Sequence, residues 1–339
     1  MSRDDVTYGS DEGRLNPVLI TEKEALVSNR HVEQSTRHKV GVSKPEVVWF
    51  GFVLAALLLL NIDNLSLWAS IVAAAALIVA SVPRLTPIVG HRVDGRDLAA
   101  VVLLYVAVVS AFRVAFTVFT TDNVLGLFLT FATGLVLGVV GPIVYQVWIR
   151  HRDLRSLGIG RHRLRGTVVV GVALAGVQFA ATLWGYQLPA PVEWVPLLVM
   201  SLVVGLFEAV FFRGFIQNRL EASFGPAPAV AGAALLYSLY HVGYGMGVGE
   251  LWFLLALGVV YAVTFRITTN VLVLWPLLTP MGALFNNLEA GDIELPWASI
   301  AGFADVAVIM AVAIWLAHRH THKRVLIAAG PPTMEMSAH

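Results

Sequence analysis

The chain has no cysteine and few charged residues, and both absences narrow what it can be. None of its 339 residues is Cys, and Asp, Glu, Lys and Arg make up 13%. The lack of cysteine excludes disulfide bonds and thiolate metal ligands. A soluble domain carries about 25% charged residues, so the low charge, with 57% hydrophobic residues and a mean hydropathy of +0.75, favours a membrane protein. We therefore expect membrane lipids as partners, and no nucleic acid.

Long apolar runs follow one another through most of the sequence. Each is long enough, or nearly so, to cross a hydrocarbon core of about 30 Å as a helix. The ten runs are residues 47–62, 66–83, 98–120, 124–149, 167–184, 195–217, 227–244, 251–266, 271–287 and 299–317. The sequence predicts an all-α, polytopic membrane helix bundle of about ten transmembrane helices in the cell membrane.

Most lysines and arginines lie in alternate connections between these runs. They occur in residues 1–45, 84–97 and 150–166 and after residue 317, and Arg219 and Arg266 mark two further ends, whereas the intervening loops at 62–65, 121–123, 185–194, 245–250 and 288–298 have none. Positive loops remain in the cytoplasm. This alternation predicts that both termini and the Arg150–Arg165 loop are cytoplasmic.

Three polar side chains lie within apolar runs and are candidates for a site. Glu208 and Arg213 interrupt one run, and His241 is the only histidine within any run. A carboxylate at membrane depth costs about 3 kcal/mol on insertion scales, and such residues are functional by default. Phe224-Gly225-Pro226 should break the helix, so that one helix ends near Ala222, about fourteen residues or 21 Å after Glu208, and the next begins near Ala227, as far before His241. Antiparallel neighbours would then hold both at one depth, where Glu208 is suited to act as a general base on water.

Structural explanations stand beside this one. Glu208 and Arg213 could form a buried polar pair, although residues five apart lie on different faces of an α-helix. His241 could be a hydrogen-bond partner between two helices. Arg113 and Asp305, the other charges within apolar runs, are expected to form a structural ion pair.

The motifs around these residues resemble those of the CPBP family, the CAAX prenyl protease type II and bacteriocin-processing, Abi-like intramembrane proteases. The segment Glu208-Ala-Val-Phe-Phe-Arg213-Gly214 is similar to its first motif, and Tyr237-Ser-Leu-Tyr-His241 to its second. Residues 270–287 fall where the third motif should be, and Leu157–Gly160 resembles the segment that precedes the motifs. The resemblance implies an endopeptidase with Glu208 as base, His241 as water-orienting partner and Asn286 as oxyanion donor. Arg213, Tyr237 and Asn287 would support them.

Two departures from the family pattern matter. The second glutamate of the first motif is Ala209, and positions 281–283, Met-Gly-Ala, lack the histidine of the third motif. Zinc takes three or more protein ligands, and only Glu208 and His241 would be available, so we predict no cofactor although the family resemblance allows zinc. Asn286 and Asn287 could equally mark a plain helix end.

The resemblance also divides the chain. We expect a disordered cytoplasmic tail at 1–45, an N-terminal four-helix membrane region at 46–149, a CPBP-like membrane domain at 150–317 and a cytoplasmic tail at 318–339. The favoured function is an intramembrane endopeptidase acting on a membrane protein or peptide. The alternative is a degenerate family member that serves as a membrane scaffold or partner-binding subunit. A transporter would show paired broken helices and repeated halves, and the sequence shows neither.

Overall fold

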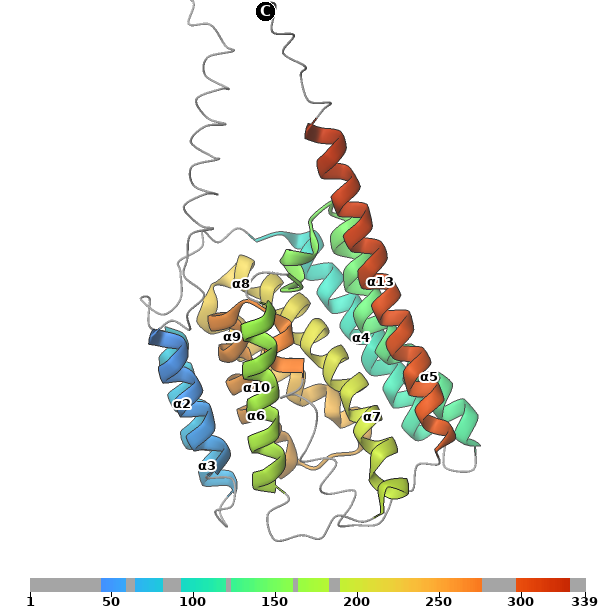
Figure 1. The fold of residues 1–339 in the computed structure, drawn as a ribbon. Helices are drawn as coiled ribbons and strands as arrows, with labels where there is room; N and C mark the ends of the chain where they lie inside the picture. The colour runs from blue at the N-terminus through green and yellow to red at the C-terminus, as the bar shows by residue number, and fades with distance from the viewer. Residues whose placement is uncertain are drawn as a thin grey trace, which may run out of the picture. The chain divides into compact units, whose positions relative to one another are not determined.

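The computed structural model describes residues 44–58, 65–81, 93–119, 123–160, 164–182, 190–275 and 297–329. Every regular element in these ranges is a helix, which confirms the predicted all-α fold for this part of the chain. The α-helices are α2 (Lys44–Leu58), α3 (Leu65–Ser81), α4 (Gly95–Thr117), α5 (Val124–Ile143), α6 (Leu164–Thr182), α7 (Pro191–Glu208), α8 (Asn218–Phe224), α9 (Pro226–Tyr240), α10 (Val248–Thr268) and α13 (Ala298–Ala329) (Figure 1). Two π-helices, η3 (Val144–Ile149) and η5 (Ala209–Gln217), continue α5 and α7, and short 3-10 turns occupy Leu154–Leu157, His241–Tyr244 and Val271–Val273.

Five helical runs in the described ranges are long and apolar enough to cross a membrane. They are Gly95–Thr117, Val124–Ile149, Trp194–Phe224, Val248–Thr268 and Ala298–Arg324. The predicted run at 271–287 begins as a single 3-10 turn, and most of it lies outside the described residues. The count of ten spans and the cytoplasmic side of the termini stay predictions.

Local sequence signals set the helix ends. Asp94 precedes α4 and its carboxylate accepts hydrogen bonds from the backbone N–H groups of Arg96 and Asp97, as expected of an N-cap. Gly225 adopts a φ of 89°, which favours glycine, and Pro226 opens α9. The helix break predicted at this dipeptide is confirmed.

The first helices pack directly against the later ones within the compact unit Ser43–His339. α3 lies against α9 and α10, and α5 lies against α7, η5 and α13. The core centres on the phenyl rings of η5 and its neighbours, with Phe207, Phe211 and Phe212 fully enclosed and Phe112 of α4 edge-on to Phe207. Residues on both sides of the expected 149/150 boundary therefore surround the segment that carries Glu208.

The last helix is longer than the apolar run that predicts it. α13 continues to Ala329, twelve residues past the expected end at 317, and Figure 1 shows it extending beyond α5. The additional turns carry basic and histidine side chains, from His318 to Arg324. Such residues end an apolar run without ending a helix, because Lys and Arg are good helix formers.

The ion pair expected between Arg113 and Asp305 is wrong. Both side chains are exposed, and neither forms an ion pair with any residue in the described ranges. Arg113 lies on the outer face of α4 and Asp305 on the outer face of α13. Their charges thus face away from the helix bundle.

Candidate active site

Glu208 lies at the junction of α7 and η5, inside the bundle. Its side chain is almost fully buried, with 2% of the residue exposed. The hydroxyl of Tyr240 donates a hydrogen bond to Oε1, and the hydroxyl of Tyr237 lies 3.5 Å from Oε2. Both tyrosines come from α9, so the predicted antiparallel neighbour does approach Glu208. The carboxylate therefore has two neutral hydrogen-bond donors, and it forms no direct ion pair among the described residues.

His241 follows α9 as the first residue of a 3-10 turn. It is buried, and its Nδ1 lies 2.9 Å from the carbonyl oxygen of Tyr237. Because a carbonyl can only accept, Nδ1 carries the proton in this hydrogen bond. A neutral imidazole then has Nε2 free as an acceptor. The ring also lies 4.0 Å from that of Tyr240, centroid to centroid.

Glu208 and His241 meet the same tyrosine but not each other. Tyr240 donates to Glu208 and packs against the His241 ring, whereas no hydrogen bond joins Glu208 to His241 in the part of the chain described. The direct form of the expected contact is thus not present. The form with one bridging water stays a prediction.

Arg213 shares this region without a charged partner within hydrogen-bond distance. The residue is fully buried, and its guanidinium carbon lies 5.0 Å from the centroid of the Tyr237 ring, a cation–π arrangement. None of its three guanidinium nitrogens has a hydrogen-bond partner among the described residues. Ala209, at the position of the family's second glutamate, is buried and offers no carboxylate.

The π-helix changes how these residues are spaced. In η5 the backbone hydrogen bonds run from i to i+5, so residues five apart lie about one turn apart. Arg213 is five residues after Glu208, and the two were expected on different faces of an α-helix. The π geometry turns both toward Tyr237, which contacts each of them.

Tyr240 and Tyr244 were missed by sequence reasoning. Together with Tyr237 and His241 they follow the i, i+3, i+4, i+7 spacing of one helix face. The tyrosine rings pack against the rings of Phe112, Phe207 and Phe212. The signal was present as three tyrosines at this spacing around the single histidine. Asn286 and Asn287 lie outside the described residues, so their roles stay predictions.

The glycine after Arg213 has a packing reason. A Cβ at Gly214 would lie 2.4 Å from the carbonyl oxygen of Leu157, so only glycine allows this approach. The 3-10 turn Leu154–Leu157 thus packs on η5, and the backbone N–H of Val271 donates to the carbonyl of Gly158. The segment before the motifs supports the helix that carries them.

Ion pairs hold the end of this helix. Asp97 of α4 is buried and accepts hydrogen bonds from Arg152, Arg219 and the Tyr145 hydroxyl. Arg266 of α10 pairs with Glu221 at 2.6 Å. The basic loop predicted from the sequence therefore contributes Arg152 to a network that ties α4 to α8.

The donors in the described part of the chain do not make a zinc site. In the described ranges no three His, Cys, Asp or Glu side chains lie together as a ligand set. Both oxygens of Glu208 face tyrosine hydroxyls, and Nδ1 of His241 is bound to a carbonyl. One carboxylate and one imidazole nitrogen fall short of the three or more protein ligands that zinc takes.

Comparison with known proteins is informative for one segment. Neither the curated proteins nor the solved structures gave a match. A family model described as "Type II CAAX prenyl endopeptidase Rce1-like" matches residues 189–278, the segment that contains Glu208, Arg213 and His241. The resemblance to the type II CAAX prenyl endopeptidases, a protease family, is therefore confirmed for this segment of the chain.

Proposed function

We propose that the chain is a membrane-embedded endopeptidase of the type II CAAX prenyl endopeptidase kind, with Glu208 as its general base. The observation that carries the proposal is the family match over the segment in which Glu208, Tyr240 and His241 lie in one buried cluster. A carboxylate enclosed in a membrane bundle with no ion pair among the described residues is costly for stability. Its retention is best explained by chemistry that needs it.

The reaction would be hydrolysis of a peptide bond in a membrane protein or peptide. Glu208 takes a proton from water, and the oxygen of that water attacks the carbonyl carbon of the scissile bond. The tetrahedral intermediate collapses as the bond to nitrogen breaks, and Glu208 returns the proton to the leaving amine. Water, peptide and proton thus balance without a further reactant.

His241 and the tyrosines have positioning roles in this scheme. Nε2 of His241 accepts a hydrogen bond from the attacking water while Nδ1 remains bound to the Tyr237 carbonyl. The Tyr240 hydroxyl fixes the direction of the Glu208 carboxylate and rotates away from one lone pair when the base takes its proton. Asn286 would donate to the oxyanion of the intermediate, as the family resemblance implies.

A second function is favoured by a specific observation. Both oxygens of Glu208 are occupied by hydroxyls, only 2% of the residue is exposed, and Ala209 replaces the second glutamate. These features suit a degenerate member that serves as a membrane scaffold or partner-binding subunit. In that case Glu208 is a buried hydrogen-bond acceptor that joins α7 to α9.

A single substitution distinguishes the endopeptidase from the scaffold. We expect Glu208→Gln to lower cleavage by about 10² to 10⁴, the usual contribution of a general base, while the helix content stays the same. Glu250→Gln is the matched control, because Glu250 is exposed and accepts a hydrogen bond from the backbone N–H of Gly247 at a helix start. Membrane peptides from cells expressing each variant are compared by mass spectrometry. Identical peptide profiles for wild type and Glu208→Gln would refute the endopeptidase and leave the scaffold.

A further inference from the structure

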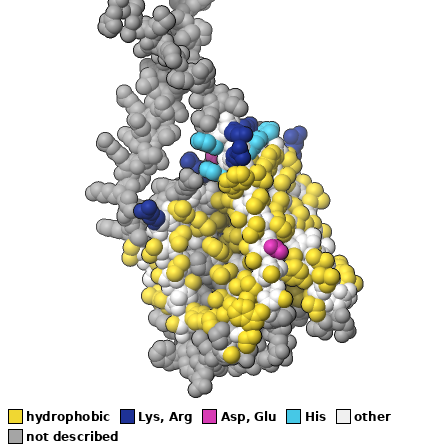
Figure 2. All heavy atoms as spheres, turned by 45° about the vertical axis from the view of Figure 1, so that its right-hand side comes forward, with side chains coloured by type: hydrophobic (Ala, Val, Ile, Leu, Met, Phe, Trp, Pro, Cys, Tyr) yellow, Lys and Arg dark blue, Asp and Glu magenta, His cyan; other side chains and the backbone are white. Residues whose placement is uncertain are grey.

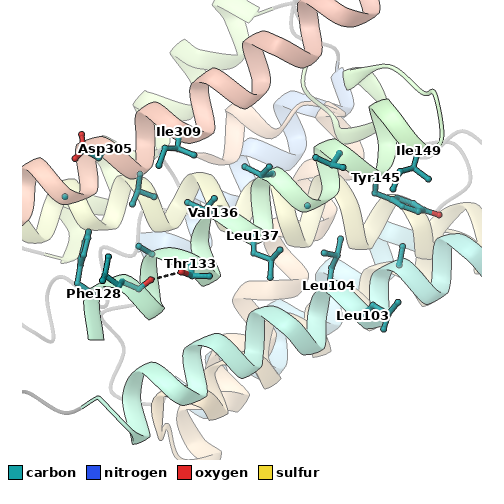
Figure 3. Close-up of a pocket in the computed structure, with 18 of the residues that line it drawn as sticks. Leu103, Leu104, Phe128, Thr133, Val136, Leu137, Tyr145, Ile149, Asp305 and Ile309 are labelled. Carbon is teal, nitrogen blue, oxygen red and sulfur yellow. Dashed lines mark hydrogen bonds between the residues drawn. The ribbon is translucent and has the colours of Figure 1, made fainter. Parts of the chain in front are cut away.

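An open groove lies on the outer face of α5, away from the candidate active site. Its volume is about 1070 Å³, and it runs between α4 and α13. Figure 3 places Asp305 and Phe128 toward one end of the groove and Tyr145 and Ile149 toward the other. Its lining is otherwise mainly aliphatic, with side chains such as Leu103, Leu104, Val136, Leu137 and Ile309.

A carboxylate in this setting requires a partner. Asp305 is exposed and has no ion pair in the described part of the chain. It lies seven residues after the start of α13, about 10 Å along the helix axis. Figure 2 shows an acidic side chain set within a hydrophobic face of the molecule. Charges at this depth are rare and normally pair with an opposite charge.

The same molecule carries the complementary charge on a neighbouring outer face. Arg113 is exposed and unpaired among the described residues, and it lies four residues before the end of α4, about 6 Å along the helix. The end of α4 is close to the starts of α5 and α13, since Phe128 packs against Phe303 and few residues join α4 to α5. Arg113 and Asp305 therefore lie at similar depths in one copy. The difference between the two depths is small enough for a long arginine side chain to span.

We propose that a second copy of this chain covers the groove, with Arg113 of each copy paired with Asp305 of the other. Both copies insert with the same orientation, so a two-fold axis along the membrane normal preserves depth. Rotation about this axis does not change the depth of any residue, so two charges that meet across it must already lie at similar depths within one copy. Arg113 and Asp305 meet this condition. The symmetry forms the ion pair twice, which leaves neither charge in hydrocarbon.

The apolar surface around the two charges fits this arrangement. Leu103, Val106 and Ser110 share the exposed stripe of α4 that ends at Arg113, at helical spacings of three and four residues. When α4 of one copy lies along the groove of the other, this stripe packs on the lining between α4 and α13. An anionic lipid headgroup would satisfy Arg113 but leave Asp305 exposed, so charge complementarity favours a second copy.

Charge reversal tests the pairing directly. Self-association of labelled protein in bilayers is followed by energy transfer as the lipid-to-protein ratio rises. We expect Arg113→Asp and Asp305→Arg each to weaken association about tenfold or more, because each replaces two attractive contacts by repulsive ones. The double variant Arg113→Asp/Asp305→Arg should restore it. A monomeric wild type, single reversals without effect, or a double variant as weak as the single ones would each overturn the proposal.

Disulfide cross-linking tests the geometry of the proposed dimer. Because the chain has no native cysteine, every disulfide must form between the introduced cysteines. If Arg113 meets Asp305 between antiparallel helices, Ser110 lies opposite Val308, three residues along each helix. Two tagged proteins are co-expressed, one with Ser110→Cys and one with Val308→Cys, so that only an intermolecular disulfide joins the tags. Val169→Cys, on the exposed face of α6, replaces Val308→Cys in the control. We expect the mixed dimer from the first pair only, and equal yields would contradict the arrangement.

Discussion

Two arginines on one continuous helical run, six residues apart, are treated differently by their surroundings. Arg219 pairs with the carboxylate of Asp97, which also binds Arg152. Arg213 has no hydrogen-bond partner among the described residues and lies over the ring of Tyr237. The end of the helix is thus neutralised by opposite charges, whereas its centre is surrounded by aromatic rings and hydroxyls.

This difference separates structural charges from candidate functional ones. A buried ion pair gives a fixed arrangement, and breaking it by removing one partner is strongly destabilising. Glu208, Arg213 and His241 contribute no such pair in the described residues. Their substitution should therefore affect stability less than activity, and the opposite should hold at Asp97.

The largest effect on stability is expected at Asp97. Asp97→Asn leaves the buried Arg219 without its carboxylate, whereas the more exposed Arg152 keeps Asp94, and the change should lower the free energy of unfolding by about 3 to 5 kcal/mol. Thermal unfolding in detergent, followed by circular dichroism, measures the change. Glu208→Gln is the matched comparison, since its partners are neutral hydroxyls. Equal destabilisation by the two variants would erase the distinction between the two regions.

The next largest effect on stability is expected at Gly214, where the helical run packs closely against Leu157. Gly214→Ala forces a Cβ against the Leu157 carbonyl, and overpacking of this kind should destabilise by about 1 to 3 kcal/mol. Gly176→Ala in α6 is the control, because an added Cβ there meets no described atom within 4 Å apart from the adjacent residues and backbone of its own helix. The control should be neutral or stabilising, as Ala favours a helix interior over Gly. If the same unfolding assay ranks them the other way, the close approach at Gly214 is wrong.

A smaller effect on stability is expected for two tyrosines, one in the candidate site and one outside it, and only their effects on cleavage should differ. Tyr240→Phe removes the donor to Glu208, and Tyr105→Phe removes a hydrogen bond of 3.0 Å to the Leu236 carbonyl. Each should lower stability by about 1 kcal/mol. Only Tyr240→Phe should also lower cleavage, because only Tyr240 orients the base. Cleavage that falls equally in both variants would assign Tyr240 a structural role alone.

The smallest change in stability is expected at Arg213. Arg213→Met removes a buried cation with no hydrogen-bond partner and replaces it with an apolar side chain of similar length, so gain and loss nearly cancel, within about 1 kcal/mol. Arg219→Met should destabilise more, since it leaves one fewer cation beside Asp97. Denaturant or thermal unfolding measures the change in the free energy of unfolding for both variants. A larger loss at Arg213 than at Arg219 would reverse the comparison.

Sequence alone predicted much of the fold because the signals are local. Apolar runs predicted the helix positions, and Gly225-Pro226 predicted the break that brings Tyr237 and Tyr240 of α9 to Glu208. The end of α13 was predicted too early, because hydropathy reports burial in lipid and not helix propensity. The polar turns after residue 317 are helical all the same.

The details of the site depended on features that no local pattern carries. A π-helix leaves no signature in hydropathy, so Glu208 and Arg213 were assigned to different faces. The pairing of Asp97 with Arg219 joins residues 122 positions apart, and only tertiary structure brings such residues together. Arg113 and Asp305 were expected to pair because both are charges within apolar runs at similar depth by residue count, whereas the structure leaves both on the outside of the bundle.

The wide turn of η5 divides the run from Trp194 to Phe224 into two segments that differ in rotational phase. A regular α-helix would fix the direction of Arg219 once that of Glu208 is chosen, because each residue adds the same rotation. The π segment inserts extra backbone between them. Glu208 can therefore face the tyrosines of α9 while Arg219 faces Asp97 of α4. Deleting one residue, such as Val210, would restore a uniform rotation and force one of the two directions to be lost.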